Sequence, residues 1–117
     1  MHEMSLVEGL LVAVRGELRA HPGARVRTVR VRVGQLRQVE PATLQFCYDA
    51  AVRETPLAGS RLEIQQVEAT AKCEVCGLQF GVQEHWFECP RCQSSNVRLL
   101  AGEEILLTDI ELESGPN

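Results

Sequence analysis

The chain has 117 residues, of which 44% are hydrophobic and 4% aromatic, and its formal net charge is −4 at pH 7. This length suffices for one domain with a modest core of Val, Leu and Ile. The negative charge argues against nucleic acid as a partner, because affinity for phosphates comes from Lys and Arg. The apolar run at residues 10–14 is too short to span a membrane and is preceded by acidic residues, unlike a signal peptide. We therefore expect a soluble cytoplasmic protein.

The N-terminal stretch predicts an amphipathic helix. Apolar residues recur there at the spacing of one helical face: Val7, Leu10, Leu11, Val14 and Leu18. Ser5 and Glu8 have the spacing of a capping box, which places the start of the helix at Ser5 or one or two residues earlier. The following His21-Pro22-Gly23 turn ends the helix.

A strand and a second helix follow. Residues 25–36 alternate between valine and arginine, which predicts a β-strand with a solvated arginine face; Val26 breaks the alternation and indicates a bulge. The Glu40-Pro41 step is typical of a helix start. On this second helix Cys47 falls on the apolar stripe, where we expect a small buried side chain.

Two cysteine pairs dominate the second half of the chain. Cys73 and Cys76 form one C-x2-C pair, and Cys89 and Cys92 form another after a gap of hairpin size. Two intervening residues let the chain turn so that both sulfurs of a pair point to one centre, and four thiolates can then surround one tetrahedral ion. Two disulfides are the alternative, but they fit a small secreted chain with a signal peptide better than this one.

The spacing alone does not distinguish zinc from iron or an iron–sulfur cluster, and zinc is the default interpretation. Residues 61–71 and 103–112 before and after the cysteines predict two further strands, each with a bulge or kink near its middle. The predicted fold class is therefore α+β: a small antiparallel or mixed three-stranded sheet with two helices on one face and an inserted zinc ribbon. Residues 1–71 with 101–117 would form the α/β domain, and residues 72–100 the ribbon.

The first three residues offer a second metal site. The free amine of Met1, the amide nitrogen of His2 and its imidazole Nδ1 can close two fused chelate rings on one ion. A nitrogen or side-chain donor of Glu3 could complete a square, the geometry that suits nickel(II) or copper(II). A histidine near an N-terminus usually has no such role, so the pattern alone is weak. His85 could donate a hydrogen bond near the cysteines or lie exposed.

These features resemble the HypA/HybF family of hydrogenase maturation factors over essentially the whole chain. The shared features, in order, are Met1-His2-Glu3-Met4-Ser5, the strand end at Val31–Leu36, Phe46 and the two cysteine pairs. The resemblance implies a metallochaperone that carries nickel(II) as cargo at Met1, His2 and Glu3. It also implies a structural zinc at the four cysteines.

The same resemblance implies two partners, the GTPase HypB and the large subunit of [NiFe] hydrogenase. Some members of the family also serve urease, which adds urease maturation factors.

Two other functions fit parts of the sequence. A rubredoxin-like electron carrier would hold iron at the cysteines and would be red. A zinc-ribbon adaptor for nucleic acid or protein would use the arginines of residues 25–37, and its binding to nucleic acid would depend on salt. An enzyme fits least, because no paired carboxylates, activated nucleophile or phosphate-binding glycine loop is present, and four protein thiolates leave a metal no open position.

Overall fold

The computed structural model describes residues 3–83 and 86–113, which form two helices, one short 3-10 helix and six strands. In chain order these are α1 (Glu3–Leu18), β1 (Arg25–Gly34), the 3-10 helix (Gln35–Arg37), α2 (Pro41–Val52), β2 (Arg61–Val67), β3 (Thr70–Cys73), β4 (Gln79–Gly81), β5 (Val97–Ala101) and β6 (Ile105–Glu113). The strands make two three-stranded sheets, ordered β2-β1-β6 and β4-β3-β5. The predicted α+β fold with two helices, a three-stranded sheet and a separate cysteine ribbon is confirmed.

The chain divides into two compact units. The first unit holds the described residues up to Arg32, then Val39–Gln65, and those from Leu106 onward. The second unit holds Val33–Gln38 and Gln66–Ile105. It therefore includes residues 33–38, 66–71 and 101–105 as well as the 72–100 segment expected to form the ribbon.

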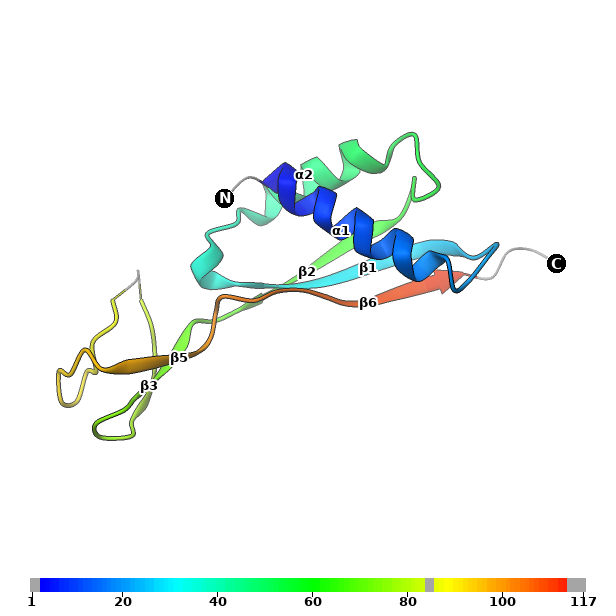
Figure 1. Ribbon diagram of the computed structural model, residues 1–117. Coiled ribbons are helices and arrows are strands. Elements are labelled where there is room, and N and C mark those ends of the chain that lie inside the picture. Colours follow the sequence, from blue (N-terminus) through cyan, green and yellow to red (C-terminus); the bar gives the residue numbers. More distant parts are fainter. Residues whose placement is uncertain (1–2, 84–85, 114–117) are drawn as a thin grey trace. The chain divides into compact units, whose positions relative to one another are not determined.

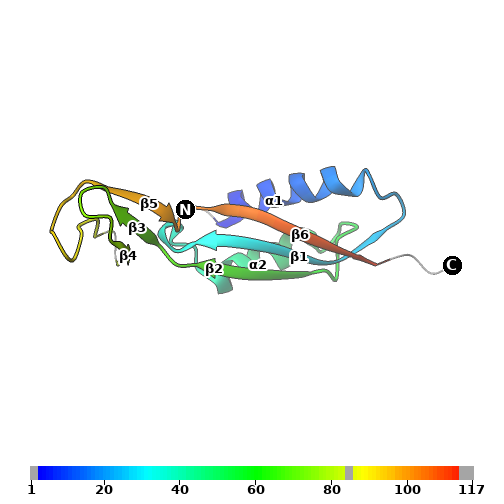
Figure 2. The ribbon, with the colours of Figure 1, turned by 90° about the horizontal axis from the view of Figure 1, so that it is seen from below.

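In the first unit, α1 and α2 lie together on one face of the sheet β2-β1-β6 (Figure 1). Strand β6 runs opposite to β1, whereas β2 follows the direction of β1, so the sheet is mixed (Figure 2). The interior contains the apolar stripe predicted for α1, of which Val7 and Val14 are fully buried. From α2, Leu44 and Tyr48 are also fully buried, and the Tyr48 hydroxyl lies 2.5 Å from the Ser60 hydroxyl.

The predicted arginine face of β1 is present and carries ion pairs. The Arg30 guanidinium donates to Glu63 on β2 at 2.9 Å and to Asp109 on β6 at 2.8 Å, with Glu111 at 3.4 Å. Arg27 lies 3.6 Å from Glu111. Because solvent reaches these groups and screens their charges, the pairs add little to stability. The face is a charge-balanced sheet surface.

Three local predictions were wrong or imprecise. Helix α1 begins at Glu3, so Ser5 lies inside its first turn and does not cap it. The strand predicted over 61–71 is two strands, β2 and β3, which belong to different sheets. Cys47 is half-buried instead of buried. Periodicity marks which residues turn inward, but it does not show where a strand leaves one sheet for another.

The second unit is built on β3, which pairs antiparallel with both β4 and β5. Its small core consists of Ala69, Ala71 and Val82, with three further apolar side chains packed against them: Leu36, Phe80 and Leu99. A core this small gives an isolated segment little stability. Domains of this size commonly gain the remaining stability from a bound metal.

The segment Val33–Gln38 adds to this unit through backbone and side-chain hydrogen bonds. The Leu36 N–H donates to the Gly102 carbonyl at 2.8 Å, and the Ala69 N–H donates to the Gln35 side-chain oxygen at 2.9 Å. A Cβ on Gly34 would stand 2.1 Å from the Gly102 carbonyl carbon, so only glycine fits there. These contacts explain why residues 33–38 and 101–105 belong to the second unit.

Candidate metal centre

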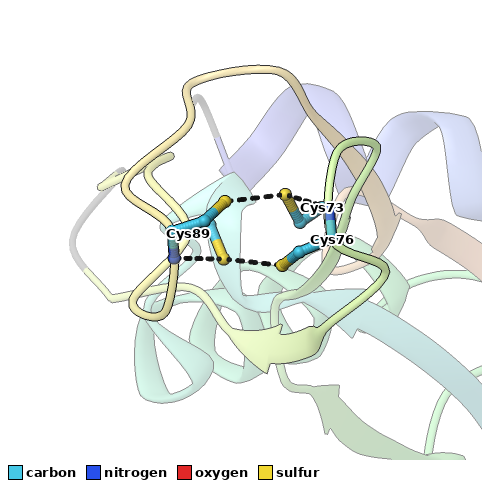
Figure 3. Close-up of side chains that lie close together, drawn as sticks. Cys73, Cys76 and Cys89 are labelled. Atoms are coloured by element: carbon cyan, nitrogen blue, oxygen red, sulfur yellow. Dashed lines mark hydrogen bonds between the residues drawn. The ribbon is translucent and has the colours of Figure 1, made fainter.

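The four cysteines predicted to bind metal come together in the second unit. Cys73 ends β3 and Cys76 follows in the turn toward β4, whereas Cys89 and Cys92 lie in a second turn ahead of β5. Their sulfurs all lie within 4.8 Å of one another, and Figure 3 shows those of Cys73, Cys76 and Cys89 directed to a common centre. The Cys73–Cys92 and Cys76–Cys89 sulfur pairs are each 3.5 Å apart.

This geometry fits one tetrahedral ion. Four bonds of about 2.3 Å from a central zinc would separate the sulfurs by about 3.8 Å. The observed separations match that spacing, whereas a disulfide needs its sulfurs about 2.05 Å apart. None of the described cysteines is in a disulfide.

Each cysteine pair sits on a turn that aims backbone N–H groups at a sulfur. The N–H groups of Val75 and Cys76 both lie 3.4 Å from the Cys73 sulfur. In the second turn the Cys92 N–H lies 3.5 Å from the Cys89 sulfur. Such donors stabilise a thiolate, because hydrogen bonds to the charged form of a group favour that form.

Hydrogen bonds already lower the pKa of two of the thiols. The backbone N–H of Leu78 and then the Arg91 guanidinium lower the pKa of Cys76 to about 6. The N–H of Cys76 is the main cause of a lowered pKa at Cys73. At Cys92 the Ser94 N–H acts in the same direction, but neighbouring thiols and burial raise its pKa to about 12. Four thiolates together therefore need a central cation, and metal affinity must fall as pH drops.

The two turns differ at the residue after the pair. The Gly77 N–H donates to the Cys73 carbonyl at 3.0 Å, and the Gln93 N–H donates to the Cys89 carbonyl at 2.8 Å. Both residues have a positive φ, 81° at Gly77 and 66° at Gln93. Glycine adopts this conformation without penalty, whereas a side chain costs about 1–2 kcal/mol.

We expect Gln93→Gly to stabilise the zinc-loaded second unit by roughly 0.5–1 kcal/mol, the usual range after the greater freedom of glycine in the unfolded chain is subtracted. Gly77→Gln at the equivalent position is the matched control and should destabilise the unit by a similar amount or more. Both effects are measured by thermal unfolding in the presence of a chelator, followed through the amide resonances of the second unit. Destabilisation by Gln93→Gly would contradict the strain assigned to Gln93.

The other predicted metal residues lie at the start of the chain. Met1 and His2 are outside the described residues, and so is His85. Glu3 is the first residue of α1 and is half-buried. In the described part of the chain, the four cysteines are the one group of three or more His, Cys, Asp or Glu residues close enough to hold a metal. A hydrogen bond from Arg91 to the Cys76 carbonyl at 2.9 Å was not foreseen from the sequence.

Comparison with known proteins identifies the family of the chain. The sequence model of the family described as "Hydrogenase/urease nickel incorporation, metallochaperone, hypA" matches residues 1–112. The chain belongs to the HypA family. A hydrogenase maturation factor HypA from Alkalilimnicola ehrlichii is 40% identical over 113 residues, covering 97% of this chain and 100% of that one. One from Pelodictyon phaeoclathratiforme is 38% identical and covers 97% of both chains.

Solved HypA structures share the fold. The solution structure of the nickel metallochaperone HypA from Helicobacter pylori superposes with a TM-score of 0.68 at 20% identity, covering 98% of this chain and all of that one. A second HypA solution structure gives 0.72 at 20% identity, with 98% of each chain covered. The resemblance to HypA/HybF proteins is thereby confirmed. Among the described residues, no helix has both the length and the apolar character needed to cross a membrane.

Proposed function

We propose that this chain is a nickel metallochaperone that binds nickel(II) at its N-terminus and delivers it to the large subunit of [NiFe] hydrogenase. The observation that carries the proposal is a family match that begins at residue 1 and so includes Met1-His2-Glu3. The GTPase HypB is the proposed partner in delivery. Because the family description also names urease, urease maturation factors are part of the proposal. The cytoplasm is the proposed compartment, because its reducing conditions keep cysteines free.

The proposed nickel ligands are the amine of Met1, the amide nitrogen and imidazole Nδ1 of His2, and a nitrogen or carboxylate donor of Glu3. Glu3 begins α1, and the first N–H groups of a helix have no acceptor within the helix. Its amide nitrogen therefore need not break a helical hydrogen bond to serve as a ligand. Nitrogen donors in a square are the set that nickel(II) favours.

The proposed role of the cysteine cluster is structural. Cys73, Cys76, Cys89 and Cys92 would hold zinc with four protein sulfurs, so no coordination position would remain for a substrate. The zinc would fix the two turns and complete a unit whose apolar core is small. The protein would act as a carrier and not as an enzyme.

The ion pairs on the sheet argue against the alternative of a nucleic-acid adaptor. Its candidate arginines include Arg27 and Arg30, both of which lie against carboxylates. A phosphate would have to compete with Glu63, Asp109 and Glu111 for the same guanidinium groups, which weakens the case for binding along this face.

We expect a cell that lacks this protein to lose [NiFe] hydrogenase activity at trace nickel and to regain much of it when nickel salt is added in excess. Excess nickel replaces a delivery factor by mass action but cannot replace a subunit or a catalyst. Hydrogen-uptake assays on the deletion strain, complemented with wild-type or His2→Ala protein, measure this. Full activity in the deletion strain at trace nickel would contradict a delivery role.

A further inference from the structure

A groove of about 450 Å³ lies on the second unit beside the metal centre, between β4 and the second cysteine turn. Phe80, Trp86 and Pro90 are the apolar residues along it, and the fully buried Cys89 also contributes to its lining. Trp86 is 66% exposed although it is the largest apolar side chain of the unit. Its backbone is held in place, because the Trp86 N–H donates to the Gln83 carbonyl at 2.8 Å. Exposed aromatic surface in a groove is typical of a binding site.

The groove runs along the outer edge of β4, which is open at two of its residues. In the register of β3 with β4, the Cys73 N–H donates to the Leu78 carbonyl and the Val82 N–H donates to the Ala69 carbonyl. Leu78 and Val82 therefore direct backbone groups toward β3. In an antiparallel pair this direction alternates from one residue to the next. The N–H and C=O groups of Gln79 and Gly81 therefore face outward, where the sheet order β4-β3-β5 places no further described strand. Two residues beyond Gly81 on the same edge, Gln83 pairs with Trp86, so the open part of the edge is the one at Gln79 and Gly81.

The charge of the groove determines which extended peptides it favours. Of the described residues that line the groove, Glu88 is the one with a carboxylate, none has a cationic side chain, and Glu88 pairs with no described cation. A partner with a basic side chain near Glu88 would gain a charge-assisted hydrogen bond, whereas an acidic one would be repelled. Outward backbone groups, an aromatic wall and one carboxylate together describe a site for an extended basic and apolar peptide.

We propose that this groove binds an extended segment of a partner protein. The segment adds a strand to the outer edge of β4, places an apolar side chain against Phe80 and Trp86, and sets a basic side chain beside Glu88. None of the residues of this groove is a proposed nickel ligand, so failure of the peptide proposal would leave the nickel proposal intact and the reverse also holds.

The test uses the zinc-loaded full chain, labelled with 15N, and a probe peptide, acetyl-Val-Lys-Leu-Lys-Val-amide. We expect binding with a Kd on the order of 10⁻⁴ M, as suits a small interface. The amide resonances of Gln79 and Gly81 should shift as they gain hydrogen bonds. Fluorescence should change in parallel, because Trp86 is the single tryptophan of the chain. The peptide with Glu in place of Lys should bind about tenfold more weakly.

Variants separate the parts of the site. Trp86→Ala should weaken peptide binding about tenfold, as expected when a central aromatic contact is removed. Val75→Ala is the matched control, because Val75 is equally exposed, at 66%, but does not line the groove. With Glu88→Gln, binding of the Lys peptide should remain measurable. The ratio of its affinity to that of the Glu peptide should fall to about threefold or less. Zinc content and unchanged resonances elsewhere in the unit verify that each variant is folded.

Three outcomes would overturn the proposal. The first is equal affinity of wild type and Trp86→Ala for the Lys peptide. The second is no binding, or binding that leaves the Gln79 and Gly81 amides unmoved. The third is a shift of those amides with protein concentration in the absence of peptide, which would make a second copy of the chain the occupant.

Discussion

Replacing Cys73 with serine should remove zinc from the chain and unfold its second unit, with the first unit left folded. A structural zinc site contributes about 10–16 kcal/mol of binding free energy to folding. The second unit has only a small apolar core around Ala69, Ala71 and Val82, and burial of that core cannot replace the free energy lost with the zinc. The first unit keeps its own core, in which Leu44 and Tyr48 are fully buried. This is the largest stability effect that we expect from a single substitution in the chain.

Zinc content by elemental analysis and a 15N amide spectrum measure the outcome. The amides of β3 and β5 should collapse into the range of unfolded chains, and those of α1 and α2 should keep their dispersion. Cys47→Ser is the matched control, because Cys47 is a half-buried cysteine outside the cluster and its loss should leave the zinc content unchanged. A Cys73→Ser protein with one zinc and a folded second unit would show that the cysteines do not hold the metal.

His2→Ala should abolish stoichiometric nickel binding and leave the zinc and the fold intact. His2 is proposed to contribute both its amide nitrogen and its imidazole to the same chelate, so alanine removes the side-chain donor and one of the two rings. The imidazole must be neutral to bind, and a free imidazole has a pKa of about 6.5. Nickel affinity of the wild-type chain should therefore fall as pH drops below that value, because protons compete for the ligand.

Isothermal titration of nickel into the zinc-loaded chain measures this. His21→Ala is the control, since it removes a histidine from the turn after α1 without touching the N-terminus. Its titration should match wild type. If His2→Ala retained wild-type affinity, or if His21→Ala lost it, the nickel ligands would lie elsewhere in the chain.

The meeting of the four cysteines could be predicted because the geometry of each pair is local. The spacing within each C-x2-C pair fixes a turn, and the turn directs N–H groups to a sulfur whatever the rest of the fold does. The positive φ of Gln93 follows from the same local rule, because it occupies the place of Gly77 in the first turn. The hydrogen bond of Arg91 to the Cys76 carbonyl depends on how the two turns face each other, and no pattern in the sequence carries that information.

The fold was predicted in outline, and the errors in its sheets share one cause. Hydrophobic periodicity identified α1 and the alternation of β1, because burial on one face imposes a period. The division of residues 61–71 between two sheets depends on partners distant in sequence, such as β5 for β3 and β1 for β2. The segment Val33–Gln38 likewise joins the second unit through hydrogen bonds to Gly102 and Ala69, which lie more than thirty residues away.

Binding of nickel at a free N-terminus and of zinc at the four cysteines can be tested by counting metals in two chains that differ only before Met1. The native chain and a chain with a Gly-Ser extension ahead of Met1 are dialysed against the same nickel solution, and metals per chain are measured. We expect one zinc and one nickel in the native chain, but one zinc and no nickel in the extended chain, because the extension converts the Met1 amine into an amide. Equal nickel in both chains would contradict nickel binding at the free N-terminus.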